Sequence, residues 1–159
     1  MLFDTLPFYM LEEERTDMEQ KHVLTFRKSE HLCSKRVMDA LFAGGNKSVV
    51  SFPVRAVFMP LEEEEGATVS VLVSVSKRHF KRAVKRNRVK RQVREAYRKH
   101  KHILTEVLEK EPGRRIALAF LWLSDRLYTS DEVDACILHL LTCIAERMDA
   151  GSAGGFSQE

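Results

Sequence analysis

The stretch RAVKRNRVKRQVREAYRKH, residues 82–100, has the spacing of an amphipathic helix with two very different faces. At about 100° per residue, its apolar side chains fall within one quadrant, as burial of a single stripe requires. These side chains are Val89, Val93, Ala96 and Tyr97. The opposite side carries Asn87, Arg91, Arg94 and Arg98, flanked by Arg88 and Lys90. We therefore predict a helix that packs through one face and presents positive charge on the other.

The charge around this helix is almost entirely of one sign. From Lys77 to Lys101 the sequence holds thirteen lysines and arginines and a single acid, Glu95. Like charges three or four residues apart repel by about 0.2–0.5 kcal/mol per pair, so a helix selected only for stability would include more acids. The pattern favours a surface that binds a polyanion over an ordinary solvated helix or a basic targeting signal.

The segments on either side of the basic helix have the patterns of strands. Upstream, TVSVLVSVS at residues 68–76 alternates valines with smaller or polar residues, which predicts one face in the core and the other open or lightly covered. Downstream, IALAFLWL at residues 116–123 is apolar without interruption, which predicts a central strand buried on both faces.

Two shorter strands are predicted earlier in the chain, SVVSF at residues 48–52 and VRAVFM at residues 54–59. They are separated by Pro53, which has no N–H to donate to a neighbouring strand. Pro60 and the EEEEG run at residues 62–66 are expected to form a hairpin loop that leads into the next strand.

Two further helices are predicted near the ends of the chain. SEHLCSKRVMDALFAGG, residues 29–45, has Ser29 as an N-terminal cap and two glycines as a stop signal. The basic helix is expected to continue to about Leu108, either as one helix or with a break near residues 100–102. Near the C-terminus, Thr129 and Glu132 have the spacing of a capping box. The apolar stripe that follows it is Val133, Ile137, Leu140, Leu141 and Ile144.

Together these elements predict the α+β class, as a two-layer α/β sandwich with about four strands in one mixed sheet and three helices. The 159 residues, 44% of them hydrophobic, suffice for one domain with a core. We place this domain at residues 23–148. Residues 1–22, which are rich in acids, are expected to be a flexible extension, and residues 149–159 a disordered tail.

Composition also narrows the function. Three scattered cysteines suit a reducing compartment, and no apolar stretch is long enough to span a bilayer, so a cytoplasmic location without a membrane partner is expected. His100 and His102 have no acid or cysteine at metal-ligand spacing, so no metal site is predicted. No acid or histidine constellation suggests a catalytic residue either.

The stretch VSVSKRHFKRAVKRNRVKRQVREAYR, residues 73–98, strongly resembles the signature of the protein subunit of bacterial ribonuclease P. The matching positions are Ser76-Lys77-Arg78, Ala83, Arg86-Asn87-Arg88, Lys90-Arg91, Arg94 and Glu95. Arg78 stands where Lys is usual, and the acidic N-terminal extension has no counterpart in the family. The resemblance implies a ribosomal-protein-S5-domain-2-like fold with a left-handed β-α-β crossover, whereas general preference favours a right-handed one.

The resemblance further implies that a large RNA is the catalyst and that this protein helps it remove the 5′ leader from precursor tRNA. The expected partners are the catalytic RNA and the leader, and no DNA. The residues expected to bind the catalytic RNA are Lys77, Arg78, Lys81, Arg82, Arg86, Asn87, Arg88, Lys90, Arg91, Arg94 and Arg98. Two alternatives remain open: a structural, salt-bridged Arg86, and an Asn87 that serves the start of the helix.

In the family, the leader lies in a cleft between the first helix and the open sheet face. By position, the candidates for this cleft are Phe42, Phe52, Arg55 and Phe58, with burial in the core as the alternative for Phe42 and Phe58. The family uses Mg²⁺ in the assembled RNA–protein enzyme, and no cofactor is expected on the protein alone. A structural RNA-binding protein of ribosomal type is the alternative function, and a self-sufficient nuclease is disfavoured.

Overall fold

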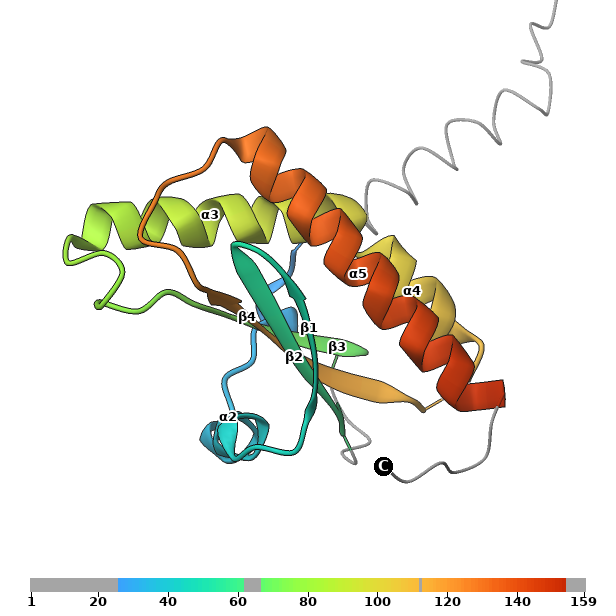
Figure 1. The fold of residues 1–159 in the computed structure, drawn as a ribbon. Helices are drawn as coiled ribbons and strands as arrows, with labels where there is room; N and C mark the ends of the chain where they lie inside the picture. The colour runs from blue at the N-terminus through green and yellow to red at the C-terminus, as the bar shows by residue number, and fades with distance from the viewer. Residues whose placement is uncertain (1–25, 62–66, 112, 154–159) are drawn as a thin grey trace, which may run out of the picture.

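The computed structural model describes residues 26–61, 67–111 and 113–153. Within these ranges four strands form one mixed sheet in the order β1-β2-β4-β3. The strands are β1 (Lys47–Ser51), β2 (Val54–Leu61), β3 (Val69–Ser74) and β4 (Arg115–Trp122). The helices are the 3₁₀ helix η1 (Lys28–Glu30) and the α-helices α2 (Lys35–Phe42), α3 (Ala83–His100), α4 (His102–Glu109) and α5 (Ser130–Ala153). Helices α3, α4 and α5 lie on one side of the sheet and α2 on the other (Figure 1).

Strand β4 is the central strand that its unbroken apolar sequence predicts. It pairs antiparallel with β2 and parallel with β3, and every residue except the half-buried Leu121 is buried. Because β4 separates β2 from β3, the expected hairpin between those two strands is wrong; residues 62–66 themselves lie outside the described ranges. Pro60 belongs to β2, beyond Phe58 where the pairing with β1 ends, so its missing N–H is tolerated there.

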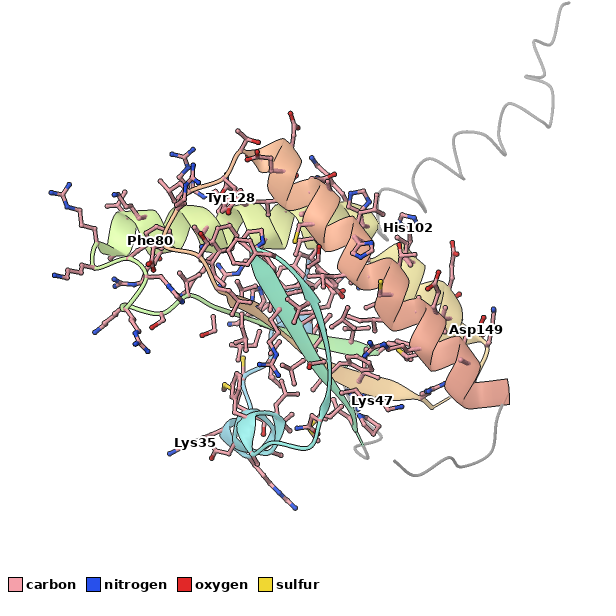
Figure 2. All side chains as sticks on the ribbon, viewed as in Figure 1. Lys35, Lys47, Phe80, His102, Tyr128 and Asp149 are labelled. Atoms are coloured by element: carbon pink, nitrogen blue, oxygen red, sulfur yellow. The ribbon has the colours of Figure 1, made fainter. Side chains whose placement is uncertain are left out.

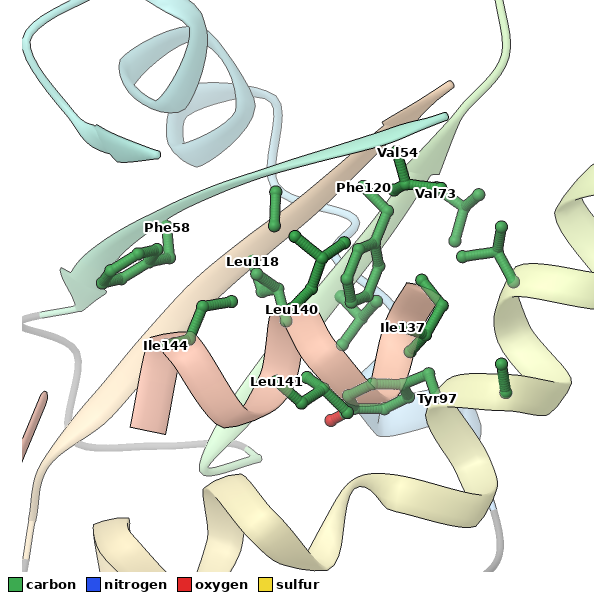
Figure 3. Packing of buried hydrophobic residues seen from close by; sticks show 14 of the residues in the cluster. Val54, Phe58, Val73, Tyr97, Leu118, Phe120, Ile137, Leu140, Leu141 and Ile144 are labelled. Atoms are coloured by element: carbon green, nitrogen blue, oxygen red, sulfur yellow. The ribbon is translucent and has the colours of Figure 1, made fainter. Parts of the chain in front are cut away.

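The main core lies between the sheet and the helices α3, α4 and α5 (Figure 3). The predicted stripe of the basic helix is buried, with Val89, Val93, Ala96 and Tyr97 each at most 2% exposed. The stripe of α5 is buried completely, from Val133 to Ile144. Valines at alternate positions of β3 face the same core, as predicted. At about 1.5–3 kcal/mol for each large apolar side chain buried, these stripes hold both helices on the sheet.

The first α-helix begins later than its sequence predicts. Ser29 lies in η1, and α2 begins at Lys35 after Ser34. The reason is a contact with the sheet: His31 forms a parallel bridge with Val71, and the Leu32 N–H donates to the Val71 carbonyl at 2.9 Å. This pairing holds the chain extended where the helical pattern begins.

The expected count of three helices is also wrong, because the long basic helix is divided into α3 and α4 at Lys101. The Lys101 side chain is buried and its Nζ lies 2.8 Å from the Glu30 carboxylate. This ion pair ties η1 to the junction of the two helices. At the other end of the chain, α5 runs to Ala153, past the expected boundary at residue 148.

A second, smaller core lies on the α2 side of the sheet. It consists of Leu32, Val37, Leu41, Val57, Ala117 and Ala119. The α2 helix covers only part of this face, because Val50 and Arg55 on neighbouring strands remain exposed. None of the helices in the described part of the chain has both the length and the apolarity needed to cross a membrane.

Candidate nucleic-acid interface

The predicted cations lie on the connector, residues 75–82, and on the outer side of α3. Eight of the predicted contact residues are exposed: Lys77, Arg78, Lys81, Arg82, Asn87, Arg88, Arg91 and Arg94. Arg86, Lys90 and Arg98 are half-buried. Figure 2 shows nitrogen-tipped side chains projecting into solvent around Phe80 and the start of α3. The structure therefore gathers exposed cations on the connector and on the outer side of α3.

A shallow hollow of about 450 Å³ lies along the polar side of α3. Its lining consists of Phe26, Asn87, Arg91, Arg94, Glu95 and Arg98. Phe26 had no place in the sequence-based prediction, because it precedes η1 and its contact with α3 depends on the fold. Its ring is fixed edge-on against His31 and Tyr97, with centroids 4.4 and 5.5 Å away. The hollow thus combines an aromatic side chain with cations and an amide.

Glu95, the acid of this surface, is held by Arg98. The Arg98 guanidinium donates to both carboxylate oxygens, at 2.6 and 3.0 Å. This hydrogen bond, with the positive charge behind it, lowers the pKa of Glu95 below its usual value. Arg98 therefore shares its charge with a neighbour on the same helix, which weakens it as a phosphate ligand relative to Arg91 and Arg94.

Arg86 points back toward the connector. Its Nη1 donates to the carbonyl oxygens of Phe80 and Lys81, at 2.9 and 2.7 Å. These contacts favour a structural role for Arg86, which was the alternative to RNA binding. Its partners are backbone carbonyl oxygens, whereas the alternative supposed a salt bridge to an acid. Because Phe80 is buried, the two hydrogen bonds fix the connector between an apolar anchor and the first turn of α3.

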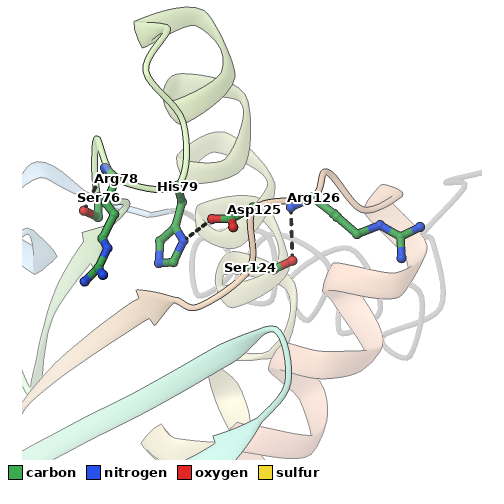
Figure 4. A network of polar contacts seen from close by, with 6 residues as sticks. All are labelled: Ser76, Arg78, His79, Ser124, Asp125 and Arg126. Carbon is green, nitrogen blue, oxygen red and sulfur yellow. Dashed lines mark hydrogen bonds and ion pairs between the residues drawn. The ribbon is translucent and has the colours of Figure 1, made fainter.

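A second set of contacts fixes the connector through Ser76 and His79 (Figure 4). The Ser76 Oγ accepts a hydrogen bond from the Arg78 N–H at 3.1 Å, which closes a tight turn. The His79 Nδ1 lies 2.6 Å from a carboxylate oxygen of Asp125, in the loop between β4 and α5. These two residues are 46 positions apart, so sequence alone gave no signal that they meet.

The candidate leader-cleft residues are divided between the two faces of the sheet. Arg55 is exposed on the α2 side and its guanidinium lies 3.3 Å from the Ser48 Oγ. Phe42, at the end of α2, and Phe52, at the β1–β2 turn, are 48% and 64% exposed. Phe58 is 5% exposed in the core beneath α5, so its assignment to the cleft is wrong. Side chains alternate along a strand, and Phe58 lies three positions after Arg55, so the two side chains point to opposite faces.

The fold and this surface define an α+β protein with an exposed cationic helix and connector, a charge distribution that is typical of nucleic-acid-binding proteins. Comparison with known proteins identifies the family. The sequence model of the ribonuclease P family, described as "Ribonuclease P", matches residues 26–115. A ribonuclease P protein component from Porphyromonas gingivalis is 47% identical over 100 residues, covering 63% of this chain and 72% of the relative. One from Chlorobaculum tepidum is 33% identical over 139 residues, covering 83% and 86%.

Solved structures agree on the fold. A mutant of the Staphylococcus aureus RNase P protein superposes with a TM-score of 0.55 at 17% identity, covering 83% of this chain and 95% of that one. The RNase P protein of Thermotoga maritima gives 0.55 at 20% identity, covering 72% and 96%. The chain belongs to the ribonuclease P protein family. It is the RNA-binding accessory subunit of that endoribonuclease, which acts in tRNA processing.

Proposed function

We propose that the connector and the outer side of α3 bind the catalytic RNA of ribonuclease P, while the α2 side of the sheet binds the 5′ leader of precursor tRNA. The observation that carries the first part is the run of cations from Lys77 to Arg94, most of them exposed, which includes no acid. A surface of this kind releases counterions from RNA and gains affinity from every phosphate that it neutralises.

Within this surface the residues take different parts. The exposed cations of the connector and of α3 contact phosphates, and Asn87 donates a hydrogen bond to phosphate or sugar. Lys90 lies at the edge of the surface. Arg86 orders the connector, and Arg98 contributes a charge that it shares with Glu95.

The leader-binding part rests on the exposed side chains of the partly covered sheet face. Single-stranded RNA is held by aromatic stacking and by cations, and each stacked base contributes about 1–3 kcal/mol. Phe42 and Phe52 supply aromatic surface, and Arg55 supplies charge for a phosphate. Phe58 has no part in this site.

We assign bond cleavage to the catalytic RNA and no step of it to the protein. Among the described residues no three His, Cys, Asp or Glu side chains gather as ligands for a metal ion. We assign Mg²⁺ to the RNA, and the protein assists by screening phosphate charge so that fewer ions are needed for the active RNA fold. We also assign the complex to the cytoplasm, where precursor tRNA is made in bacteria.

Precursor-tRNA cleavage tests this proposal directly. The reaction is run with the protein alone, with the catalytic RNA alone and with both, at low Mg²⁺ concentration. We expect leader removal mainly in the third mixture. Cleavage by the protein alone would contradict the assignment of catalysis to the RNA. An unchanged rate on addition of protein would favour a structural RNA-binding protein of ribosomal type.

A further inference from the structure

The loop between β4 and α5 lies against the connector, although it carries an acid into a strongly cationic region. Asp125 accepts a hydrogen bond from the His79 imidazole, with 2.6 Å between Nδ1 and Oδ1. The side chain of Asp125 is 76% exposed and that of His79 is 23% exposed. The loop itself is ordered by the Ser124 Oγ, which accepts from the Arg126 N–H at 3.1 Å.

We propose that Asp125 is a positioning residue for RNA binding, which holds the connector through His79 so that the connector's cations meet the RNA in a fixed arrangement. The inference rests on the proposed function, because it assumes that the connector contacts the catalytic RNA. It gives Asp125, which is negatively charged like RNA, an indirect role in RNA binding.

The contacts on each side of His79 support this role. Toward the N-terminus, the Ser76 turn fixes Arg78; toward the C-terminus, Phe80 is buried and its carbonyl is held by Arg86. The His79–Asp125 contact connects this part of the connector to another segment of the chain. Without it, the cations on either side of His79 would sample more conformations, and RNA binding would have to order them at a cost in entropy.

The proposal can be tested by whether Asp125→Asn raises or lowers the affinity for RNA. A carboxylate beside cations repels RNA, so electrostatics alone predicts that Asp125→Asn increases affinity. Positioning predicts the opposite result, because the amide is a weaker acceptor for an imidazole N–H than the carboxylate. The two explanations therefore differ in the direction of the change as well as in its size.

The experiment is a binding titration of the full-length protein with the catalytic RNA of ribonuclease P encoded in the same genome, at fixed salt. We expect Asp125→Asn to weaken binding about three- to fivefold, which is the size expected when one hydrogen bond is weakened. Asp131→Asn is the matched control: it removes the same charge from the exposed first turn of α5, where Ser130 contacts Gln92 of α3. That variant should bind as tightly as the wild type or slightly more tightly. Equal or tighter binding by Asp125→Asn would overturn the proposal.

Two further measurements separate positioning from a general loss of structure. Amide hydrogen exchange in Asp125→Asn should become faster in the connector and stay unchanged in β4, because the weakened contact joins the connector to the loop after β4 and not to the strand. His79→Leu should weaken binding as Asp125→Asn does, whereas His79→Gln, which keeps a donor for the carboxylate, should restore most of it. Equal binding by the two His79 variants, or faster exchange throughout the molecule, would contradict the proposal.

The same variants separate this inference from the proposed function. With Asp125→Asn, the protein concentration for half-maximal activation of precursor-tRNA cleavage should rise, while the maximal rate stays at the wild-type value. If the wild-type protein neither bound the RNA nor activated cleavage, the proposed function itself would fail. If the wild type activated cleavage and Asp125→Asn did so at the same concentration, only the role of Asp125 would fail.

Discussion

Arginines of one motif have different tasks in this protein. Arg91 is exposed on the outer side of α3, whereas Arg86, five positions earlier, donates to two carbonyl oxygens of the connector. Both are cations close to the proposed RNA surface. Arg91 is exposed and can neutralise a phosphate, whereas Arg86 donates its hydrogen bonds to the protein's own backbone.

This difference predicts different salt dependences for two alanine variants. Log K falls as log salt rises, and Arg91→Ala should make this negative slope shallower by about 0.7–0.9, because one phosphate contact is lost. Arg86→Ala should also weaken binding but leave the slope near the wild-type value, because it disorders the connector without removing a contact. Binding titrations between low and moderate salt measure both slopes. Equal losses of slope would show that Arg86 contacts a phosphate as well.

Tyr97 predicts a pH dependence of stability. It is fully buried, and within the described residues its hydroxyl oxygen has no hydrogen-bond partner. Burial, with a smaller effect of the negative charge of Glu30, raises the pKa of Tyr97 far above its usual value. The hydroxyl of Tyr97 ionises at lower pH in the unfolded chain than in the folded protein. Burial of the neutral tyrosine therefore contributes its full stability below about pH 10, and the folded state loses stability relative to the unfolded chain as the pH rises further.

Tyr97→Phe should therefore lose less stability than the wild type between pH 9 and pH 11, by about 1 kcal/mol. At pH 7 the two proteins should differ by no more than about 1 kcal/mol, because the deleted hydroxyl makes no hydrogen bond. Urea unfolding at each pH gives both quantities, and the difference between the proteins cancels the titration of all other groups. A parallel decline of both proteins would contradict this assignment.

At the scale of elements, local chemistry determines where α5 begins. The Thr129 N–H donates to the Glu132 carboxylate at 2.9 Å, and the Glu132 N–H donates to the Thr129 hydroxyl at 3.3 Å. This is the capping box that the sequence predicts. All the residues of the motif lie within one turn, so the start of this helix follows from the local sequence.

Thr129→Ala should lower the free energy of unfolding by about 1 kcal/mol, because a backbone N–H at the start of α5 loses its partner. Thr129→Ser, which keeps the hydroxyl, should stay within about 0.5 kcal/mol of the wild type. Chemical denaturation of the three proteins measures these differences. Equal stability of the alanine and serine variants would mean that the hydroxyl does not cap the helix.

The whole molecule separates two proposed binding surfaces by one sheet. Helices α3 and α5 cover one face, and the candidate leader residues Phe42 and Arg55 lie on the side of α2. The connector, at the end of β3, lies at the border between the two. One small domain can therefore contact the catalytic RNA and a single-stranded leader at the same time.

This separation predicts that the two surfaces act independently on substrate binding. In the assembled enzyme, Arg55→Ala should weaken binding of precursor tRNA several-fold and leave binding of mature tRNA unchanged, since only the precursor has a leader. Arg91→Ala should instead raise the protein concentration needed for assembly. Binding assays with both tRNAs test this, with Lys35→Ala, an exposed cation of α2, as the control. Equal loss for precursor and mature tRNA would reject the leader role of Arg55.

Where a feature depends on neighbours in the chain, the sequence alone was sufficient. The two faces of the basic helix, the burial of β4 on both sides and the capping box of α5 all follow from spacing, since each is set within a few turns or one strand. The same kind of spacing places Phe58 in the core, because an odd number of positions from Arg55 puts the two side chains on opposite faces of the strand.

Contacts between distant segments were decided only by the tertiary structure. The pairing of Leu32 with Val71 delays the start of α2, the position of β4 between β2 and β3 removes the expected hairpin, and Glu30 meets Lys101 where α3 ends. Each joins residues dozens of positions apart, whose meeting depends on how the chain folds back and not on local spacing. Sequence thus defined which surface is charged, and the fold determined which of its residues are free to bind and which hold the others in place.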